Sequence, residues 1–68
     1  MSAGQYVVNN NAQSNGDHEV HIPGCLYFPR NHTSLGYHSG CRSAVVEARR
    51  HYPQSNGCAT CSPDCHTS

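Results

Sequence analysis

The clearest hydrophobic pattern in the chain lies over residues 40–51. Four apolar residues recur at the i, i+3, i+4 and i+7 positions: Cys41, Ala44, Val45 and Ala48. This spacing places side chains on one face of an α-helix. Ser39 precedes the pattern as a candidate N-cap and Pro53 follows it, so both ends carry ordinary helix boundary signals. We therefore predict one amphipathic helix of about three turns.

The remaining pattern favours short β elements. Residues 18–22 alternate and carry β-branched side chains, which predicts a short strand that ends near His21, before the turn-forming pair Pro23-Gly24. A second short strand is expected around residues 35–37. Residues 54–57 are read as a turn, and residues 62–68 as a dispensable tail too short for another element.

The first 17 residues are rich in Asn, Ser, Gln and Gly. Apart from Tyr6-Val7-Val8 they offer little to pack, so we predict a flexible, disordered N-terminal tail over residues 1–17. The folded domain is then expected over residues 18–68. Its predicted class is α+β, with a short β-sheet or hairpin and one main helix.

The amino-acid composition predicts a small hydrophobic core. The chain has 68 residues, of which 35% are hydrophobic, below the roughly 45–50% of ordinary globular domains. A domain this small buries only about 60% of its unfolded surface, so a cross-link is expected to support the fold.

Charge and hydropathy limit the classes of partner and location. Four Arg and four acidic residues give a formal net charge of zero, which does not favour nucleic acid as the partner because phosphate contacts need basic residues. No stretch has the length and hydrophobicity of a secretory signal or a membrane span. We therefore expect a cytoplasmic monomer that contacts no membrane and binds a protein partner.

Two pairs of candidate metal ligands stand far apart in the sequence. His21 and Cys25 form an H-x3-C pair, and Cys58 and Cys61 form a C-x2-C pair. Structural zinc sites are typically built from two such closely spaced pairs, with thiolates and imidazoles in a tetrahedron. We therefore predict that His21, Cys25, Cys58 and Cys61 bind Zn²⁺. With all four positions filled by protein, the metal is structural and no enzymatic activity is expected.

Several alternatives stay open at this stage. Cys65 or His66 could replace His21 as the fourth ligand. Cys41 lies on the apolar helix face and is read as a buried free thiol, although a thiol-based sensor using Cys41 or Cys65 is an alternative function. A secreted peptide stabilised by disulfides is another, but the odd count of five cysteines does not favour it.

The order of these motifs resembles the Ada-type metal-binding domain, found in bacterial regulators of DNA alkylation repair and in some secreted nucleases. The stretches VHIPGC, LGYHS, SAVVEA and CATC follow one another as in that family and span about residues 18–61. The resemblance implies a small zinc-binding fold. In the repair proteins a cysteine that accepts methyl groups stands where this chain has His21, so that activity is not implied here.

The expected role is therefore recognition, by an adaptor or regulatory module with a structural zinc ion. A candidate contact surface is the helix face bearing Arg42, Arg49 and Arg50, together with Tyr27 and Tyr37.

Overall fold

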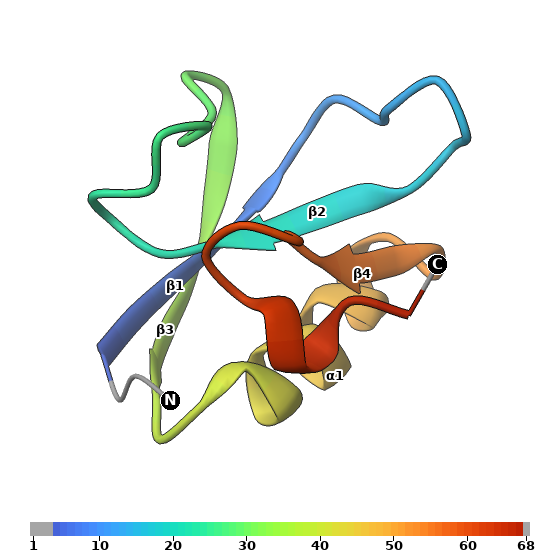
Figure 1. Ribbon diagram of the computed structural model, residues 1–68. Helices are drawn as coiled ribbons and strands as arrows, with labels where there is room; N and C mark the ends of the chain where they lie inside the picture. Colours follow the sequence, from blue (N-terminus) through green and yellow to red (C-terminus); the bar gives the residue numbers. More distant parts are fainter. Residues whose placement is uncertain (1–3, 68) are drawn as a thin grey trace.

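The computed structural model describes residues 4–67 and shows a small α+β domain, as predicted. Its elements in chain order are β1 (Gly4–Asn9), β2 (His18–His21), β3 (His32–His38), α1 (Cys41–His51), β4 (Ser55–Gly57) and the 3-10 helix η1 (Pro63–Cys65) (Figure 1).

The four strands form one mixed sheet in the order β3-β1-β2-β4. Strand β1 pairs antiparallel with both β2 and β3, whereas β2 and β4 run parallel with Val20 opposite Gly57. Because parallel strands end at the same edge of a sheet, the residues that follow β2 and β4 emerge side by side. This edge positions the candidate metal ligands.

Helix α1 packs against one face of the sheet and ends where the sequence predicts, at His51. Ala44, Val45 and Ala48 are buried, as the periodicity requires. The N-cap is Gly40 rather than Ser39, and no side chain caps the first turn. The predicted N-cap is therefore wrong by one residue, and the helix begins without a capping hydroxyl.

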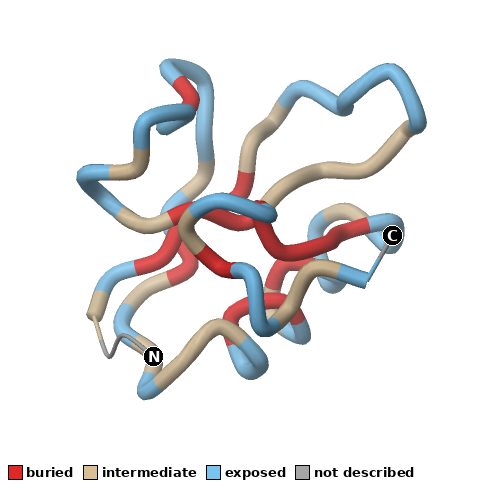
Figure 2. The backbone as a smooth tube through the Cα atoms, viewed as in Figure 1, coloured by how far each residue is buried: buried red, intermediate tan, exposed pale blue. Residues whose placement is uncertain are grey.

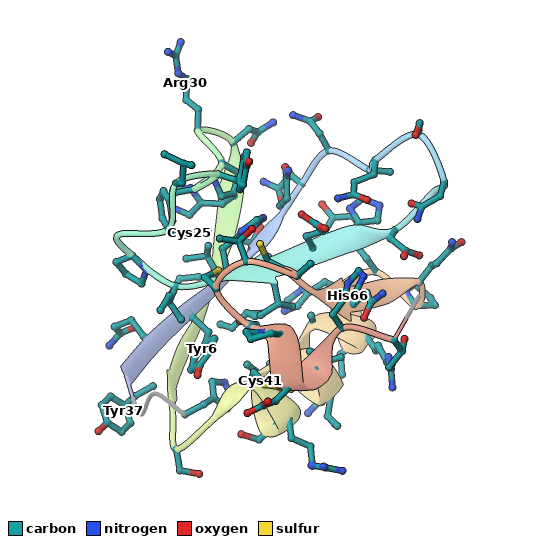
Figure 3. All side chains as sticks on the ribbon, in the orientation of Figure 1. Tyr6, Cys25, Arg30, Tyr37, Cys41 and His66 are labelled. Carbon is teal, nitrogen blue, oxygen red and sulfur yellow. A yellow bond between two sulfur atoms is a disulfide. The ribbon has the colours of Figure 1, made fainter. Side chains whose placement is uncertain are left out.

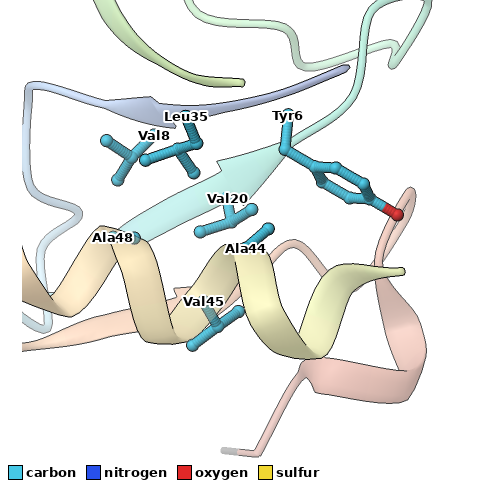
Figure 4. Close-up of a cluster of buried hydrophobic side chains, with 7 residues drawn as sticks. All are labelled: Tyr6, Val8, Val20, Leu35, Ala44, Val45 and Ala48. Atoms are coloured by element: carbon cyan, nitrogen blue, oxygen red, sulfur yellow. The ribbon is translucent and has the colours of Figure 1, made fainter. Parts of the chain in front are cut away.

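The core lies between α1 and the sheet. It consists of seven buried residues: Tyr6, Val8, Val20, Leu35, Ala44, Val45 and Ala48 (Figure 4). Figure 2 shows the buried segments gathered where the strands cross and on the part of α1 that lies below them in this view, while the connecting loops are mostly exposed or half-buried. Five of the seven core residues are Ala or Val, so the core is built mainly from small or β-branched aliphatic side chains.

The prediction of a flexible tail over residues 1–17 is wrong for residues 4–9. These residues form β1, an inner strand of the sheet, and Tyr6, Val7 and Val8 are buried. Three apolar residues suffice because strands on both sides complete the hydrogen bonding of β1 and α1 covers its core face. The folded unit therefore does not begin at residue 18, and residues 1–3 lie outside the described part.

The other short elements agree with expectation only in part. The predicted strand at residues 18–22 is confirmed as β2, and the strand expected at 35–37 is longer, as β3. The predicted turn at 54–57 is largely strand β4, whose residues are all buried. The sequence pattern does not indicate this strand, because Ser55, Asn56 and Gly57 are residue types that favour turns. Their strand conformation depends on backbone pairing with β2.

Within residues 4–67, no helix is long and apolar enough to cross a membrane.

Because β1 contributes to the core, a substitution in it should destabilise the domain. Val8→Ala should lower the free energy of unfolding by about 2 kcal/mol, because it removes fully buried methyl groups and leaves a cavity. Val46→Ala is the matched control: Val46 is 59% exposed on α1, and its change should stay within about 0.5 kcal/mol. The measurement is urea unfolding followed by circular dichroism. Equal effects of the two substitutions on the free energy of unfolding would instead support a flexible N-terminal tail.

Candidate metal centre

The four predicted ligands come together at the edge where β2 and β4 end. His21 is the last residue of β2, and Cys58 directly follows β4. The Cys58 N–H donates to the carbonyl of Val20 at 3.0 Å, which continues the parallel ladder for one more residue. His21 and Cys58 are thus neighbours because the two strands are paired in this register.

Tight turns return the second ligand of each pair to the same place. The Cys25 N–H donates to the carbonyl of Ile22 at 3.1 Å, which closes the turn through Pro23-Gly24. Gly24 has a φ of 94°, a left-handed conformation that favours glycine. The Ser62 N–H donates to the carbonyl of Cys58 at 2.8 Å, and this turn brings Cys61 back towards Cys58.

The ligand atoms form a compact group. His21 Nδ1 lies 3.6 Å from Cys25 Sγ and 3.7 Å from Cys61 Sγ, and the Sγ atoms of Cys25 and Cys58 are 3.9 Å apart. All four ligand atoms lie within 4.8 Å of one another. In a tetrahedral zinc site the corresponding edges are about 3.6 Å for nitrogen to sulfur and about 3.8 Å for sulfur to sulfur. The group could therefore hold a metal ion.

Burial sets the protonation of the imidazole. His21 is 1% exposed, and this burial lowers its pKa, although the nearby Glu19 carboxylate acts in the opposite direction. A neutral imidazole with Nδ1 facing the sulfurs is the form that binds a metal.

The Cys61 thiol is held in its neutral form when no metal is bound. Burial raises its pKa to about 12, and hydrogen bonding with Cys25 adds to the effect. A metal ion must therefore displace the Cys61 proton in order to bind. One backbone donor already faces a sulfur atom of this group, since the Thr60 N–H lies 3.4 Å from Cys58 Sγ.

Glu19 is a candidate supporting residue of this site that was not predicted from the sequence. Its Oε1 lies 3.5 Å from Nε2 of His21, the ring nitrogen that faces away from the sulfurs. Carboxylates at this position orient a metal-binding histidine and increase its basicity. The available signal was the i, i+2 spacing of Glu19 and His21, which places both side chains on one face of a strand.

Cys41 and Cys65 form a disulfide, with a sequence separation of 24 residues. The interpretation of Cys41 as a free buried thiol is therefore wrong. Its place on the apolar helix face was predicted correctly, but no local pattern indicates that η1 packs against the start of α1. Of the five cysteines only the three in the candidate metal centre are free.

The segment after Cys61 is not a dispensable tail. The His66 Nδ1 lies 3.0 Å from the carbonyl oxygen of Gly57, and the Thr67 N–H donates to Asn56 Oδ1 at 3.1 Å. A Cβ added at Gly57 would come within 2.8 Å of the Cys65 Cβ, so the two backbones pack closely. Neither Cys65 nor His66 belongs to the group of four, and the alternative in which one of them replaces His21 has no geometric support.

Comparisons with protein-family models, with curated proteins and with solved structures find no match to this chain.

The role of Glu19 can be tested directly. Glu19→Gln should weaken zinc binding about 10–100-fold, because the amide no longer stabilises the His21 orientation that presents Nδ1 to the metal. Competition with a chromophoric chelator measures the affinity. Glu47→Gln is the matched control, since Glu47 lies on α1 and forms its ion pairs there with Arg50 and His51. An unchanged affinity in Glu19→Gln would show that the carboxylate does not support the site.

Proposed function

We propose that the chain is a small zinc-binding domain in which one Zn²⁺ ion, held by His21, Cys25, Cys58 and Cys61, cross-links the sheet edge. The observation that carries the proposal is the convergence of the four ligand atoms within 4.8 Å of one another, with three of their separations between 3.6 and 3.9 Å. Three soft sulfur ligands with one imidazole suit zinc better than the hard cations, which prefer oxygen.

A structural role follows from the number of ligands. Four protein ligands complete the coordination of zinc and leave no position for an activated water or a substrate. The ion would join two segments that are 33 residues apart at Cys25 and Cys58. We therefore propose a domain without enzymatic activity, in which the metal supports a core of seven residues.

The Ada-type resemblance is kept as the finer form of this proposal. The order of the H-x3-C pair, the helix and the C-x2-C pair supports it. An imidazole at position 21 cannot accept a methyl group as the thiolate of the repair proteins does, so methyl transfer is not proposed.

A binding or adaptor role is supported by the loop that follows Cys25. Leu26 and Tyr27 are 82% and 62% exposed, and Phe28 is exposed beside them. Consecutive large apolar side chains on a surface are typical of protein contact sites. Cys25 fixes one end of this loop at the metal centre, so zinc would order the surface that the partner contacts. A protein partner therefore fits better than nucleic acid.

The helix face proposed from the sequence is a weaker candidate. Arg42, Arg49 and Arg50 are all exposed, but Arg50 Nη1 lies 3.7 Å from Glu47 Oε1. The Arg49 Nε donates to the carbonyl of Ser55 at 3.4 Å. Two of the three guanidinium groups are thus already engaged within the domain.

The disulfide favours a second candidate function, in which the domain responds to redox conditions or acts in an oxidising compartment. Disulfides persist in such compartments and are rare in the cytoplasm. A thiol sensor that uses Cys41 or Cys65 would then work through reduction of their bond, not through a free thiol. This observation argues against the cytoplasmic location expected from the sequence.

The zinc proposal predicts one Zn²⁺ per chain in native mass spectrometry. His21→Ala should weaken zinc binding by more than the about 10–100-fold expected for Glu19→Gln, because it removes a ligand itself. His21→Cys should retain zinc, since a thiolate can replace the imidazole in a tetrahedral site. His66→Ala is the control, because His66 lies outside the group, and it should bind zinc as the parent does. Parent-like affinity in His21→Ala would refute the assignment.

The pKa of Cys61 predicts how zinc binding depends on pH. Because burial raises this pKa to about 12, the thiol is protonated in the metal-free protein throughout the neutral range. Zinc binding must release that proton, so the affinity should rise at least about tenfold for each unit of pH between 6 and 8. Isothermal titration calorimetry in buffers of different ionisation enthalpy counts the protons released. Binding without proton release would contradict a thiolate ligand at Cys61.

A further inference from the structure

The candidate metal centre holds two free cysteines that a small movement would bring to bonding distance. The Sγ atoms of Cys25 and Cys58 lie 3.9 Å apart, and neither residue takes part in the disulfide of the domain. The S–S distance in a disulfide is about 2.05 Å, so the two atoms need to approach by roughly 1.9 Å. Figure 3 shows Cys25 close to the segment that follows β4, with Cys41 below it in this view, at the start of α1.

Cys25 is the more accessible member of this pair. It is half-buried in a loop where the neighbouring residues Gly24 and Leu26 are exposed, whereas Cys58 is only 3% exposed. A small oxidant from solvent therefore reaches Cys25 first, with Cys58 beside it. Cysteines that respond to oxidants typically combine access to solvent, thiolate character and a second cysteine nearby. Coordination to zinc supplies the thiolate character, because a metal-bound thiol is deprotonated.

We propose that Cys25 and Cys58 are a redox-active pair, which a hydroperoxide converts to a disulfide with release of the zinc ion. The inference rests on the proposed zinc function and extends it, because two of the residues that hold the ion also react with the oxidant. A hydroperoxide fits the site because it is small and reacts directly with thiolates. The sensing thiols then lie in the metal centre and not at Cys41 or Cys65.

The oxidation consists of two balanced steps. The Cys25 thiolate attacks one oxygen of hydrogen peroxide, so that an S–O bond forms, the O–O bond breaks and hydroxide leaves. The Cys58 thiolate then attacks the Cys25 sulfur, so that the S–S bond forms, the S–O bond breaks and a second hydroxide leaves. Each hydroxide takes a proton from solvent and becomes water. The two sulfur atoms together lose two electrons, which the peroxide gains, while Zn²⁺ keeps its charge.

The new disulfide removes two of the four zinc ligands. The thiolate is the form of cysteine that binds a metal, and both sulfur atoms lose their negative charge in the S–S bond. Only His21 and Cys61 then remain, whereas a structural zinc site needs four protein ligands. The ion therefore passes to any competing chelator in solution.

The oxidised domain keeps a cross-link between the same two segments. Cys25 and Cys58 are separated by 33 residues and lie in the segments that follow β2 and β4. A disulfide that closes a loop of this size stabilises a fold, mainly by restricting the unfolded chain. The loop that begins at Leu26 stays anchored at Cys25 in both states. Oxidation should thus release zinc without unfolding the domain.

The experiment treats the zinc-loaded full chain with a small excess of hydrogen peroxide and follows zinc release with a chromophoric chelator. About one zinc ion should leave each chain. Denaturing mass spectrometry should show the loss of two hydrogen atoms, and circular dichroism should show a folded domain. The oxidised form should also unfold at a higher urea concentration than the metal-free protein prepared with a chelator alone. Retention of zinc, addition of oxygen without loss of hydrogen, or unfolding on oxidation would overturn the proposal.

Peptide mapping identifies the bond that forms. The thiol that remains after oxidation is alkylated, and trypsin then cleaves after Arg30 and Arg50 without reduction of the disulfides. Residues 1–30 should stay linked to residues 51–68, with the alkyl group on Cys61. An alkyl group on Cys25, with residues 1–30 unlinked, would show a Cys58–Cys61 bond, and one on Cys58 would show a Cys25–Cys61 bond. Either result would refute the assignment.

Two matched variants test the order of reaction, because each removes one free cysteine of the centre. Cys61→Ser keeps both reactive sulfurs and should form the disulfide at a rate close to that of the parent. Cys25→Ser lacks the accessible sulfur and should react at least about tenfold more slowly. Equal rates in the two variants would contradict attack at Cys25. If either variant fails to fold, the peptide map of the parent still decides the pairing.

The same samples separate this inference from the zinc proposal on which it rests. Native mass spectrometry before oxidation tests the zinc proposal alone, and a chain without zinc there would refute both. A chain that carries one zinc ion and keeps it in hydrogen peroxide would refute the redox-active pair and leave the structural zinc site intact.

Discussion

The parallel pairing of β2 with β4 is the constraint on which the rest of the structure depends. It is a register of three residue pairs, from His18 opposite Ser55 to Val20 opposite Gly57. That register alone places His21 beside Cys58, and the two tight turns then bring Cys25 and Cys61 to the same point. A shift by one residue would move His21 out of line with Cys58 and turn its side chain to the other face of the sheet.

The domain compensates for a thin core by connecting its elements at several points. The core holds two alanines and only one leucine, and the largest side chain in it is Tyr6. The disulfide joins α1 to η1, and the candidate metal centre joins the ends of β2 and β4. Close backbone contact at Gly57 connects β4 to η1, so the C-terminal segment contributes to all of these connections.

The elements that could be predicted from the sequence are those specified by neighbouring residues. The helix follows from its periodicity, β2 from its alternation, and the four ligands from their two short spacings. It failed where the signal comes from distant partners: β1 looks like a polar tail until strands flank it, and β4 reads as a turn until β2 supplies its hydrogen bonds. The pairing of Cys41 with Cys65 is of the same kind, because no local pattern shows that η1 meets the start of α1.

The order of the strands has a consequence for the synthesis of this protein on the ribosome. The first strand made, β1, is an inner strand whose partner β3 is completed only at His38, and β2 waits for β4. The ligand group is complete only at Cys61, and the disulfide at Cys65. The nascent chain must therefore carry an exposed Tyr6-Val7-Val8 stretch until β3 is complete at His38 and α1 follows it to His51. Folding of this domain is complete only after β4, Cys61 and Cys65 have also left the tunnel.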